Sequence, residues 1–500
     1  MRMRHTLTLS GMLIGLAGLL HFLGLTNSHD WGGDFAQYLM QAKSLVEQNT
    51  INFIASNSFT INASSTPPGP VAYPWGFPLL LAPIYAWTGV NLIAFKLVVL
   101  GFYIGFLLVL YVGLRQRLSA YALLTVLSLF AFSPSLMRFN DEILSDIPFL
   151  FFSTAALLMI NNRPFTSVLR GFGLGVIIFS AFLIRTNGIL LIPTLLITFL
   201  GMAIIEAMAG NWKWTILRSV QSYYFCHERV YFLASVISVF MALYGMAIVS
   251  LPEGQSSHLN HLRQISAQQL FSHFFYYLIL PAEFFSPNTS RLAGLPIYLL
   301  TLPFFCLGVR KYWKENIGFC VYFVLTFMMY VVWPHTQGLR FFLPIIPIYV
   351  FFFVLGTEVI QTKVLGLSPK ALPKAIIVMF VIVCSYLAAK HVMHENSKQD
   401  GPYSADSIEM FDFIRANSAA SDVVIFRKPR VMTFMTGIRS VRITQEEDIE
   451  KLNAVRLIVL DNKNLSGQLS DKYIQQKIQN HSLALAFAND QFKAYLILQR

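Results

Sequence analysis

The sequence has 500 residues, of which 55% are hydrophobic and only 12% are charged. Roughly a quarter of the residues in a typical soluble domain are charged, so this composition excludes an ordinary soluble protein. The formal net charge of +12 comes from basic residues scattered singly between apolar stretches. Nucleic-acid binding needs a stripe or cluster of positive charge, so we expect no nucleic acid among the partners.

Eleven apolar stretches have about the length that crosses the hydrocarbon core of a bilayer, roughly 20 residues. They lie at residues 7–26, 91–113, 119–137, 144–160, 169–184, 188–208, 229–251, 292–309, 317–333, 340–357 and 374–390. The first follows a basic start but precedes no small-residue cleavage site, so we interpret it as a retained helix and not as a signal peptide. The sequence therefore predicts an α-helical polytopic membrane protein with about 11 transmembrane helices.

Two further apolar stretches, residues 73–89 and 273–285, are shorter and contain proline and aromatic residues. We expect each to lie on or dip into the outer face of the membrane, with an ordinary short span as the alternative for either. If the N-terminus is inside, the inner loops carry most of the Lys and Arg residues, among them Arg115, Arg117 and Arg310. This asymmetry satisfies the positive-inside rule and predicts that the C-terminal region is outside.

The composition changes at about residue 391, and 13 of the 25 acidic residues fall after this point. The patterns there predict an amphipathic helix at 404–418, a short helix at 428–437 and a capped helical segment at 443–453. They also predict buried strands at 422–426 and 455–461 and a closing strand pair at 483–499.

We therefore expect two domains. The first is a transmembrane domain over residues 1–390, which includes an outer-face loop at residues 27–90. The second is a small soluble α/β domain over residues 391–500. Its basic run from Phe426 to Arg430 is more typical of a solvated loop than of a binding site.

Acidic side chains are rare in the apolar part of the chain, because an unpaired carboxylate beside hydrocarbon is costly and is usually retained for a function. Five of them gather in two segments: Asp30 and Asp34 after the first span, and Asp141, Glu142 and Asp146 before the fourth. The predicted topology places both segments on the outer face, where paired carboxylates could serve acid–base chemistry or cation binding. Alternatively, Asp34 and Asp146 could be N-caps of the helices that they precede.

Three basic residues, Lys96, Arg185 and Arg340, lie near the outer ends of predicted spans. A lone arginine in such a place usually extends toward lipid head groups. Several cations that converge beside carboxylates would instead suit a phosphate-bearing substrate, because a guanidinium binds phosphate through two parallel hydrogen bonds.

Five segments in a fixed order, DFAQYLMQAKSL, YPWGFPLLL, SDIPF, RTNGILL and RFFLPIIP, resemble the GT-C membrane glycosyltransferases. The resemblance covers roughly residues 1–390 and is nearest to the aminoarabinose–lipid A transferases and to bacterial relatives of the protein O-mannosyltransferases, glycosyltransferase family 39. It implies a multi-pass enzyme at the periplasmic face of a bacterial inner membrane. Such an enzyme transfers a sugar from a polyprenyl-phosphate donor to a hydroxyl of a lipid, glycan or protein.

The resemblance also implies roles for individual residues. Asp34 would be the general base on the acceptor, Asp146 the second catalytic carboxylate, and Arg340 the ligand of the donor phosphate. Many members have an Asp-Glu pair in the first loop, whereas Phe35 follows Asp34 here. The remaining predicted substrate-binding residues stand in or beside the same outer-face segments and are Lys96, Arg185, Tyr38, Glu142 and Tyr73. A direct displacement would invert the anomeric centre of the sugar.

We expect no cofactor, since the sequence has neither a G-x-G-x-x-G motif nor a P-loop, which fits a lipid-borne donor. A divalent cation stays open, and His258 with His261 could hint at one, although this spacing is more often incidental. The main alternative function is a polyprenyl-lipid or glycolipid transporter or flippase, because charges inside membranes also mark substrate paths. A transporter should show related halves and broken spans near the midplane, and we find no such repeat.

Overall fold

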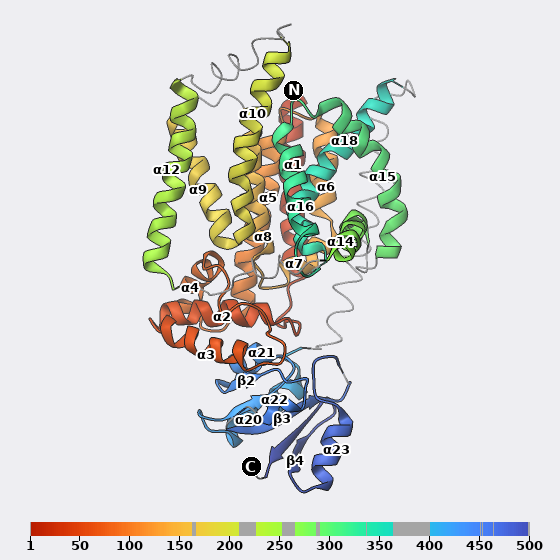
Figure 1. Ribbon diagram of the computed structural model, residues 1–500. Coiled ribbons are helices and arrows are strands. Elements are labelled where there is room, and N and C mark those ends of the chain that lie inside the picture. The colour runs from red at the N-terminus through yellow and green to blue at the C-terminus, as the bar shows by residue number, and fades with distance from the viewer. Residues whose placement is uncertain are drawn as a thin grey trace.

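The computed structural model describes residues 2–162, 167–209, 227–252, 266–286, 291–336, 338–363, 401–450, 452, 454–463 and 465–498. Figure 1 shows a bundle of helices, a layer of short helices at one end of it, and an α/β domain beyond this layer. The N-terminal end of the first helix and the α/β domain lie at opposite ends of the bundle.

The helices of the bundle follow one another along most of the chain. They are α1 (Arg2–Leu23), α5 (Leu92–Leu114), α6 (Ala120–Ala131), α7 (Pro134–Asn140), α8 (Asp146–Asn161), α9 (Val168–Ile184), η1 (Thr186–Leu190), α10 (Leu191–Ala209), α12 (His227–Ser250), α14 (Ala267–Ile279), η2 (Leu280–Phe285), α15 (Arg291–Tyr312), α16 (Ile317–Val331), α17 (Leu339–Phe342), η3 (Leu343–Ile345) and α18 (Ile346–Lys363). The layer beside the bundle consists of α2 (Gly33–Val46), α3 (Thr50–Asn62) and α4 (Gly76–Thr88).

Six helices in the described part of the chain are long and apolar enough to cross a membrane, or seven if α6 and α7, which meet at 51°, form one bent span. The six are α1, α5, η1 with α10, α12, α15, and α17 with η3 and α18. Helices α8, α9 and α16 coincide with predicted spans but have only 16, 17 and 15 residues. The predicted span at 374–390 lies outside the described residues, and each of the others coincides with a helix.

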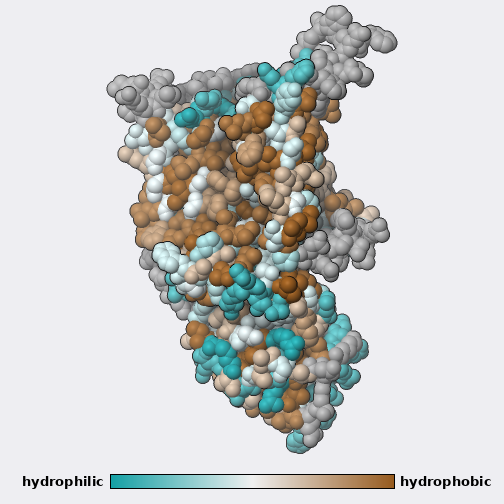
Figure 2. All heavy atoms as spheres, turned by 90° about the vertical axis from the view of Figure 1, so that its left-hand side faces the viewer, coloured by the Kyte–Doolittle hydropathy of each residue, from teal (hydrophilic) through white to brown (hydrophobic). Residues whose placement is uncertain are grey.

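The outside of the bundle is apolar. Figure 2 shows hydrophobic side chains over the face of the bundle turned to the viewer, whereas hydrophilic side chains are more frequent toward the α/β domain. Exposed examples are Leu108 and Val112 of α5, Met241 of α12 and Met328 of α16. Soluble proteins rarely expose such extended apolar surface, so the helix lengths and this surface together confirm a multi-pass membrane protein.

Helix α4 lies in the first short apolar stretch, and α14 followed by η2 covers the second; α4 and α14 have 13 residues each. At about 1.5 Å per residue, such a helix spans roughly 20 Å, which is less than the roughly 30 Å of the bilayer core. This length is compatible with helices that lie on or dip into one face of the membrane, and that placement stays a prediction. Gly76 lets α4 start against α9, because a Cβ at this position would lie 2.6 Å from the backbone of Leu183.

The C-terminal domain is built on a five-stranded sheet of order β2-β1-β3-β5-β4. Strand β1 is parallel to β2 and β3, while β5 is antiparallel to β3 and β4. The elements in chain order are α20 (Ala405–Asn417), β1 (Val423–Ile425), α21 (Pro429–Thr436), β2 (Arg439–Val441), α22 (Glu447–Glu450), β3 (Val455–Asp461), α23 (Asp471–Gln479), β4 (Leu483–Ala488) and β5 (Phe492–Ile497). The predicted α/β architecture is confirmed, and β2 and α23 are additions to the predicted elements.

The C-terminal domain packs on the loop at residues 27–90. The Trp31 indole lies among three rings of the domain, with ring centroids 6.3, 5.7 and 5.8 Å from those of Phe411, Phe426 and Phe492. At the β2 edge, the Ser65 backbone N–H donates to the Arg442 carbonyl at 2.9 Å. One apolar core therefore continues from the bundle through the loop into the domain. The predicted boundary at residues 390–391 lies outside the described residues.

Candidate active site

Asp34 lies in the first turn of α2, which begins at Gly33 after Gly32 as the N-cap residue, and no side chain makes a capping hydrogen bond there. Its carboxylate accepts a hydrogen bond from the Tyr73 hydroxyl, with 2.6 Å between Oη and Oδ1. Oδ2 accepts a second bond from Arg340 Nη1 at 2.8 Å. The alternative that Asp34 serves as a helix N-cap is therefore wrong.

Asp146 is the first residue of α8, after Ser145 as the N-cap residue, and its side chain also makes no capping bond. Arg340 donates to it twice, from Nη2 to Oδ2 at 3.1 Å and from Nε to Oδ1 at 3.4 Å. Arg185 forms a further ion pair with Oδ1. Because the carboxylate is almost fully buried, these cations compensate a charge that could not otherwise stay in this place.

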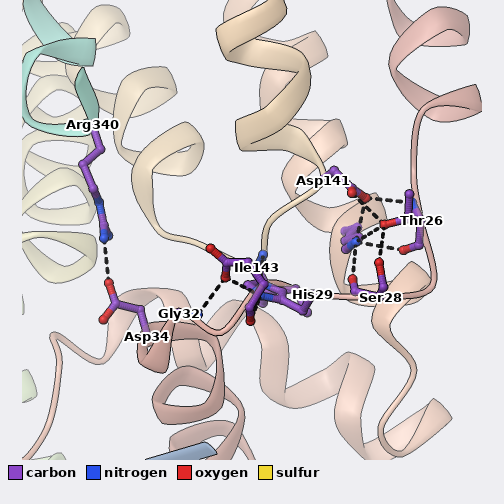
Figure 3. Close-up of polar contacts among 10 residues, drawn as sticks. Thr26, Ser28, His29, Gly32, Asp34, Asp141, Ile143 and Arg340 are labelled. Atoms are coloured by element: carbon purple, nitrogen blue, oxygen red, sulfur yellow. Dashed lines mark hydrogen bonds and ion pairs between the residues drawn. The ribbon is translucent and has the colours of Figure 1, made fainter. Parts of the chain in front are cut away.

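Arg340 thus bridges two carboxylates from distant segments, and Figure 3 shows its side chain extended toward Asp34. The turn before it is held by two further groups. The Gly338 N–H donates to the Tyr276 hydroxyl at 3.1 Å, and the Leu339 N–H donates to Glu283 Oε2 at 3.2 Å. Gly338 has a φ of +61°, which glycine adopts without a steric penalty.

Arg185 follows α9 directly, and its guanidinium carbon lies 5.9 Å from the Phe149 ring centroid and 5.8 Å from that of Phe341. Both arginines converge on carboxylates, so the alternative that each is a lone residue extending toward lipid head groups is wrong. We call Asp34, Asp146, Arg185 and Arg340 the acid–arginine cluster.

Two tyrosines border the acid–arginine cluster. The Tyr38 hydroxyl lies 2.8 Å from Ser145 Oγ, and the Tyr38 ring centroid is 5.0 Å from that of Tyr73. Burial and the neighbouring Asp34 charge raise the pKa of Tyr38 to about 12. The same two causes raise the pKa of Tyr73 well above its usual value. Both hydroxyls therefore keep their protons at neutral pH and can donate hydrogen bonds.

Burial opposes the charge of Asp34, but Arg340, Tyr73 and Arg430 outweigh it and lower the pKa of this carboxyl to about 2. Glu142, in the loop before α8, behaves oppositely. Burial and the charge of Asp30 raise the pKa of Glu142 to about 8. At neutral pH the site therefore holds an ionised Asp34 and a protonated Glu142.

Lys96 bonds to a different set of residues, and Figure 3 shows three of them, Thr26, Ser28 and Asp141, apart from Asp34 and Arg340. Its Nζ donates to the carbonyls of Thr26 and Ser28, both at 2.8 Å, and to Asp141 Oδ1 at 2.6 Å. Asp141 also accepts from the Thr26 backbone N–H at 2.7 Å. We call Thr26, Ser28, Lys96 and Asp141 the Lys96 tether, because they fix the chain after α1 to α5. The predicted role of Lys96 at the donor phosphate does not fit this position.

Asp30, the other acid of the first loop, stands between Ser28 and Asp34 in the sequence. It accepts from the Gly32 N–H at 2.8 Å and lies 3.0 Å from His29 Nδ1. The Ile143 N–H, which can only donate, points at His29 Nε2 at 3.1 Å. His29 therefore carries its proton on Nδ1 and donates it to Asp30, which is a structural bond outside the acid–arginine cluster.

Arg430, in the first turn of α21, was not among the predicted site residues. It is 2% exposed. Its Nη1 donates to the Tyr73 hydroxyl at 3.0 Å, and its Nη2 donates to the Pro70 carbonyl at 2.5 Å. The prediction of a solvated loop at residues 426–430 is wrong, because Phe426 and Arg427 are buried as well. A usable signal was the position of this run directly after a buried strand, at the sheet edge where α/β domains often place functional groups.

No group of three or more His, Cys, Asp and Glu side chains suited to a metal ion occurs in the part of the chain that the structure describes. His258 and His261 lie outside that part. The acids of the acid–arginine cluster are paired with guanidinium groups, which leaves them poorly suited as metal ligands.

No protein-family model and no curated protein matches the sequence. Solved structures do match the fold. ArnT from Cupriavidus metallidurans, an aminoarabinose–lipid A transferase, superposes with a TM-score of 0.57 in its complex with undecaprenyl phosphate, at 12% identity over 97% of both chains. In the apo state of ArnT the TM-score is 0.55 at 11% identity, again over 97% of both chains.

The oligosaccharyltransferase AglB from Archaeoglobus fulgidus, in complex with an inhibitory peptide and a dolichol-phosphate, gives a TM-score of 0.54 at 11% identity. This match covers 90% of the present chain and 69% of AglB. Both ArnT and AglB are members of the GT-C superfamily. The GT-C fold expected from the five sequence segments is therefore confirmed.

Proposed function

We propose that this protein is an integral-membrane glycosyltransferase that uses a polyprenyl-phosphate sugar at the periplasmic face of a bacterial inner membrane. The observation that carries the proposal is Arg340, held between Asp34 and Asp146 at the loop end of a GT-C fold. The likeness to ArnT, which was crystallised with undecaprenyl phosphate, and to AglB, with dolichol-phosphate, supports a lipid-linked donor.

The charges of the site support a phosphate ligand. Among the groups joined by these ion pairs and hydrogen bonds, the guanidinium groups of Arg185, Arg340 and Arg430 outnumber the carboxylates of Asp34 and Asp146, which is an excess of one positive group. Protonated Glu142 adds no charge at neutral pH. A phosphodiester between a sugar and a polyprenol carries one negative charge, which would balance this excess. Arginine is well suited to the contact, because its planar fork binds phosphate oxygens through parallel hydrogen bonds.

In the proposed reaction, Asp34 takes the proton of the acceptor hydroxyl as its oxygen attacks the anomeric carbon. The bond between that carbon and the phosphate oxygen breaks, and the polyprenyl phosphate leaves with one additional negative charge. Arg340 stabilises this developing charge. The products are the glycoside, polyprenyl phosphate and protonated Asp34. One direct displacement inverts the anomeric centre.

The same geometry links donor binding to the strength of the base. A carboxyl with a pKa of about 2 accepts protons poorly, and the Arg340 charge is the largest of the effects that keep the pKa of Asp34 so low. When Arg340 binds a donor phosphate instead, Asp34 Oδ2 loses its hydrogen-bond partner. The pKa of Asp34 then rises, and a lone pair of Oδ2 becomes free for the proton of the acceptor. Asp34 then becomes an effective base only in the presence of the donor.

The test has two steps. First, mass spectrometry of membrane glycolipids, cell-surface glycans and periplasmic proteins, with and without the gene, identifies the sugar and the acceptor. Second, the purified protein in detergent micelles is given the identified donor and acceptor. Micelles have no two sides, so a flippase would form no product there, whereas the proposed enzyme would. Absence of product with the wild-type protein would rule out the transferase.

A further inference from the structure

The C-terminal domain contributes a side chain to the site. The Arg430 guanidinium from α21 lies against Tyr73, with 5.1 Å from its carbon to the ring centroid, and donates to the Tyr73 hydroxyl at 3.0 Å. That hydroxyl donates its single proton to Asp34 at 2.6 Å. The three groups form one directed chain of hydrogen bonds, in which each donor polarises the next.

The loop that faces Arg430 is shaped for it. Gly69 has a φ of +138°, a conformation that side chains rarely adopt. A Cβ at Gly69 would lie 3.0 Å from Arg430 Nη2 and 3.1 Å from Nη1. Glycine therefore leaves the space that the guanidinium occupies and lets the next carbonyl, that of Pro70, accept from Nη2.

Attachment of the C-terminal domain does not explain why a buried arginine stands at position 430. Trp31 and the paired backbone at Ser65 already hold the domain on the outer-face loop. Arg430 is buried with its Nε unpaired in the described structure. A buried cation with an unsatisfied donor is costly, so a residue serving only to hold the interface would be better replaced by an apolar side chain.

We propose that Arg430 is a positioning residue of the active site, which holds the Tyr73 hydroxyl and through it Asp34, so that the docked C-terminal domain completes the site. This inference rests on the proposed function, in which Asp34 is the base. Without Arg430 the Tyr73 hydroxyl is free to rotate away, and Asp34 loses both a fixed hydrogen bond and a nearby positive charge. The domain then acts as part of the catalytic unit and not only as a cover.

The experiment measures the protonation of Asp34 directly. Infrared spectra of the purified full chain are recorded against pH, and subtraction of the Asp34→Asn spectrum isolates the Asp34 carboxyl band. The titratable and charged groups around Asp34 come from several elements: Tyr38 of α2, Tyr73 before α4, Arg340 of α17, and Lys428 and Arg430 at the start of α21. The variants are Arg430→Gln, Tyr73→Phe, the double variant, and Arg439→Gln as a control at the same interface, where Arg439 lies over the Phe59 ring.

We expect Arg430→Gln and Tyr73→Phe each to raise the titration midpoint of Asp34 by about one pH unit, since each removes a group that favours the ionised form. The double variant should shift less than the sum, because both changes cut the same chain. Arg439→Gln should leave the midpoint unchanged. A folded Arg430→Gln protein with the wild-type midpoint would overturn the proposal.

If Arg430→Gln does not fold, Tyr73→Phe decides, because it breaks the chain and leaves Arg430 on Pro70; an unchanged midpoint then overturns the proposal. Binding of undecaprenyl phosphate to the wild-type protein is measured in parallel. Its absence would count against the proposed function and not against the positioning of Asp34, so the two failures are distinguishable.

Discussion

The Lys96 tether and the acid–arginine cluster both pair cations with carboxylates, and Figure 3 shows Thr26, Ser28 and Asp141 of the first in one view with Asp34 and Arg340 of the second. Lys96 is completely buried, and two of its partners are backbone carbonyls. The side chains of Arg340 and Asp34 are 23% and 24% exposed, and the hydrogen-bond partners of Arg340 among the described residues are carboxylates. A cation bound by backbone holds the fold, whereas an accessible cation shared between two acids can exchange a partner for a ligand.

The largest effect that this comparison predicts is on stability. Lys96→Met should lower the free energy of unfolding by about 3–5 kcal/mol, because it leaves Asp141 and two carbonyls without their buried partner. Chemical unfolding of the purified protein measures the change. The control is Lys43→Met, whose half-exposed pair with Glu47 should contribute less than about 1 kcal/mol. A stable Lys96→Met protein with little turnover would place Lys96 in the active site after all.

The second prediction concerns turnover. Asp34→Asn should reduce sugar transfer by roughly 100-fold or more, the typical contribution of a positioned base, while folding and donor binding persist. Asparagine keeps one acceptor oxygen for Tyr73 or Arg340, but its amide nitrogen cannot accept the other bond, and the side chain cannot take a proton at neutral pH. Transfer of a radiolabelled sugar in membranes provides the measurement.

Asp30→Asn is the matched control for Asp34→Asn. Its bonds are to His29 and Gly32, outside the acid–arginine cluster, so its effect should be much milder. Near-normal turnover of Asp34→Asn, or an equal loss in both variants, would contradict the role of Asp34 as the base.

The third prediction tests whether Arg340 exchanges a carboxylate partner for the donor phosphate. Arg340→Lys keeps the charge but loses the planar fork, so binding of undecaprenyl phosphate should weaken by about tenfold, or roughly 1.4 kcal/mol. Equilibrium binding to the protein in nanodiscs measures this change. Arg439→Lys, on the C-terminal domain, should bind as the wild type does. Equal affinity for Arg340→Lys would remove Arg340 from the donor site.

The smallest effect should come from Glu142. Its pKa is about 8 in the folded protein, against 4.5 for the ordinary group, so the folded state holds more protons than the unfolded state between these values. Stability must therefore fall as pH rises from about 4.5 to 8, and Glu142→Gln should remove this part of the decline. The difference should be on the order of 1 kcal/mol at high pH, since Glu142 is only half-buried. Parallel unfolding curves of both proteins across this window would contradict it.

Much of the fold could be predicted from the sequence. Long apolar stretches dictate helices in any context, and buried strands in the C-terminal domain, such as Val423 to Ile425, form short apolar runs. Asp34, Asp146, Arg185 and Arg340 could be proposed as site residues because ionisable groups are scarce beside apolar spans. The pattern could not decide whether Asp34 and Asp146 are helix caps or site residues, because their contacts with Arg340 join residues more than 190 positions apart.

Lys96 and Arg430 show that a sequence pattern does not reveal the contact partners of a residue in distant segments. A lone lysine at the end of a span looks the same whether it meets a substrate or two backbone carbonyls of another segment. Arg430 stands 357 residues after Tyr73, on a domain with a different composition, so only docking of that domain reveals the contact. Sequence periodicity describes which face of an element is buried, but it does not say what the buried face touches.

The long sequence separation between the residues of the site also determines when they can first meet during synthesis of the chain. Arg340 follows Asp34 by 306 residues, which a ribosome adds in roughly 15–60 s at about 5–20 residues per second. Arg442, which pairs with the loop at Ser65, comes later still. A growing chain in the membrane therefore exposes the first loop for tens of seconds before its partners exist. Under the proposed function, nascent and prematurely released chains cannot consume the lipid-linked donor.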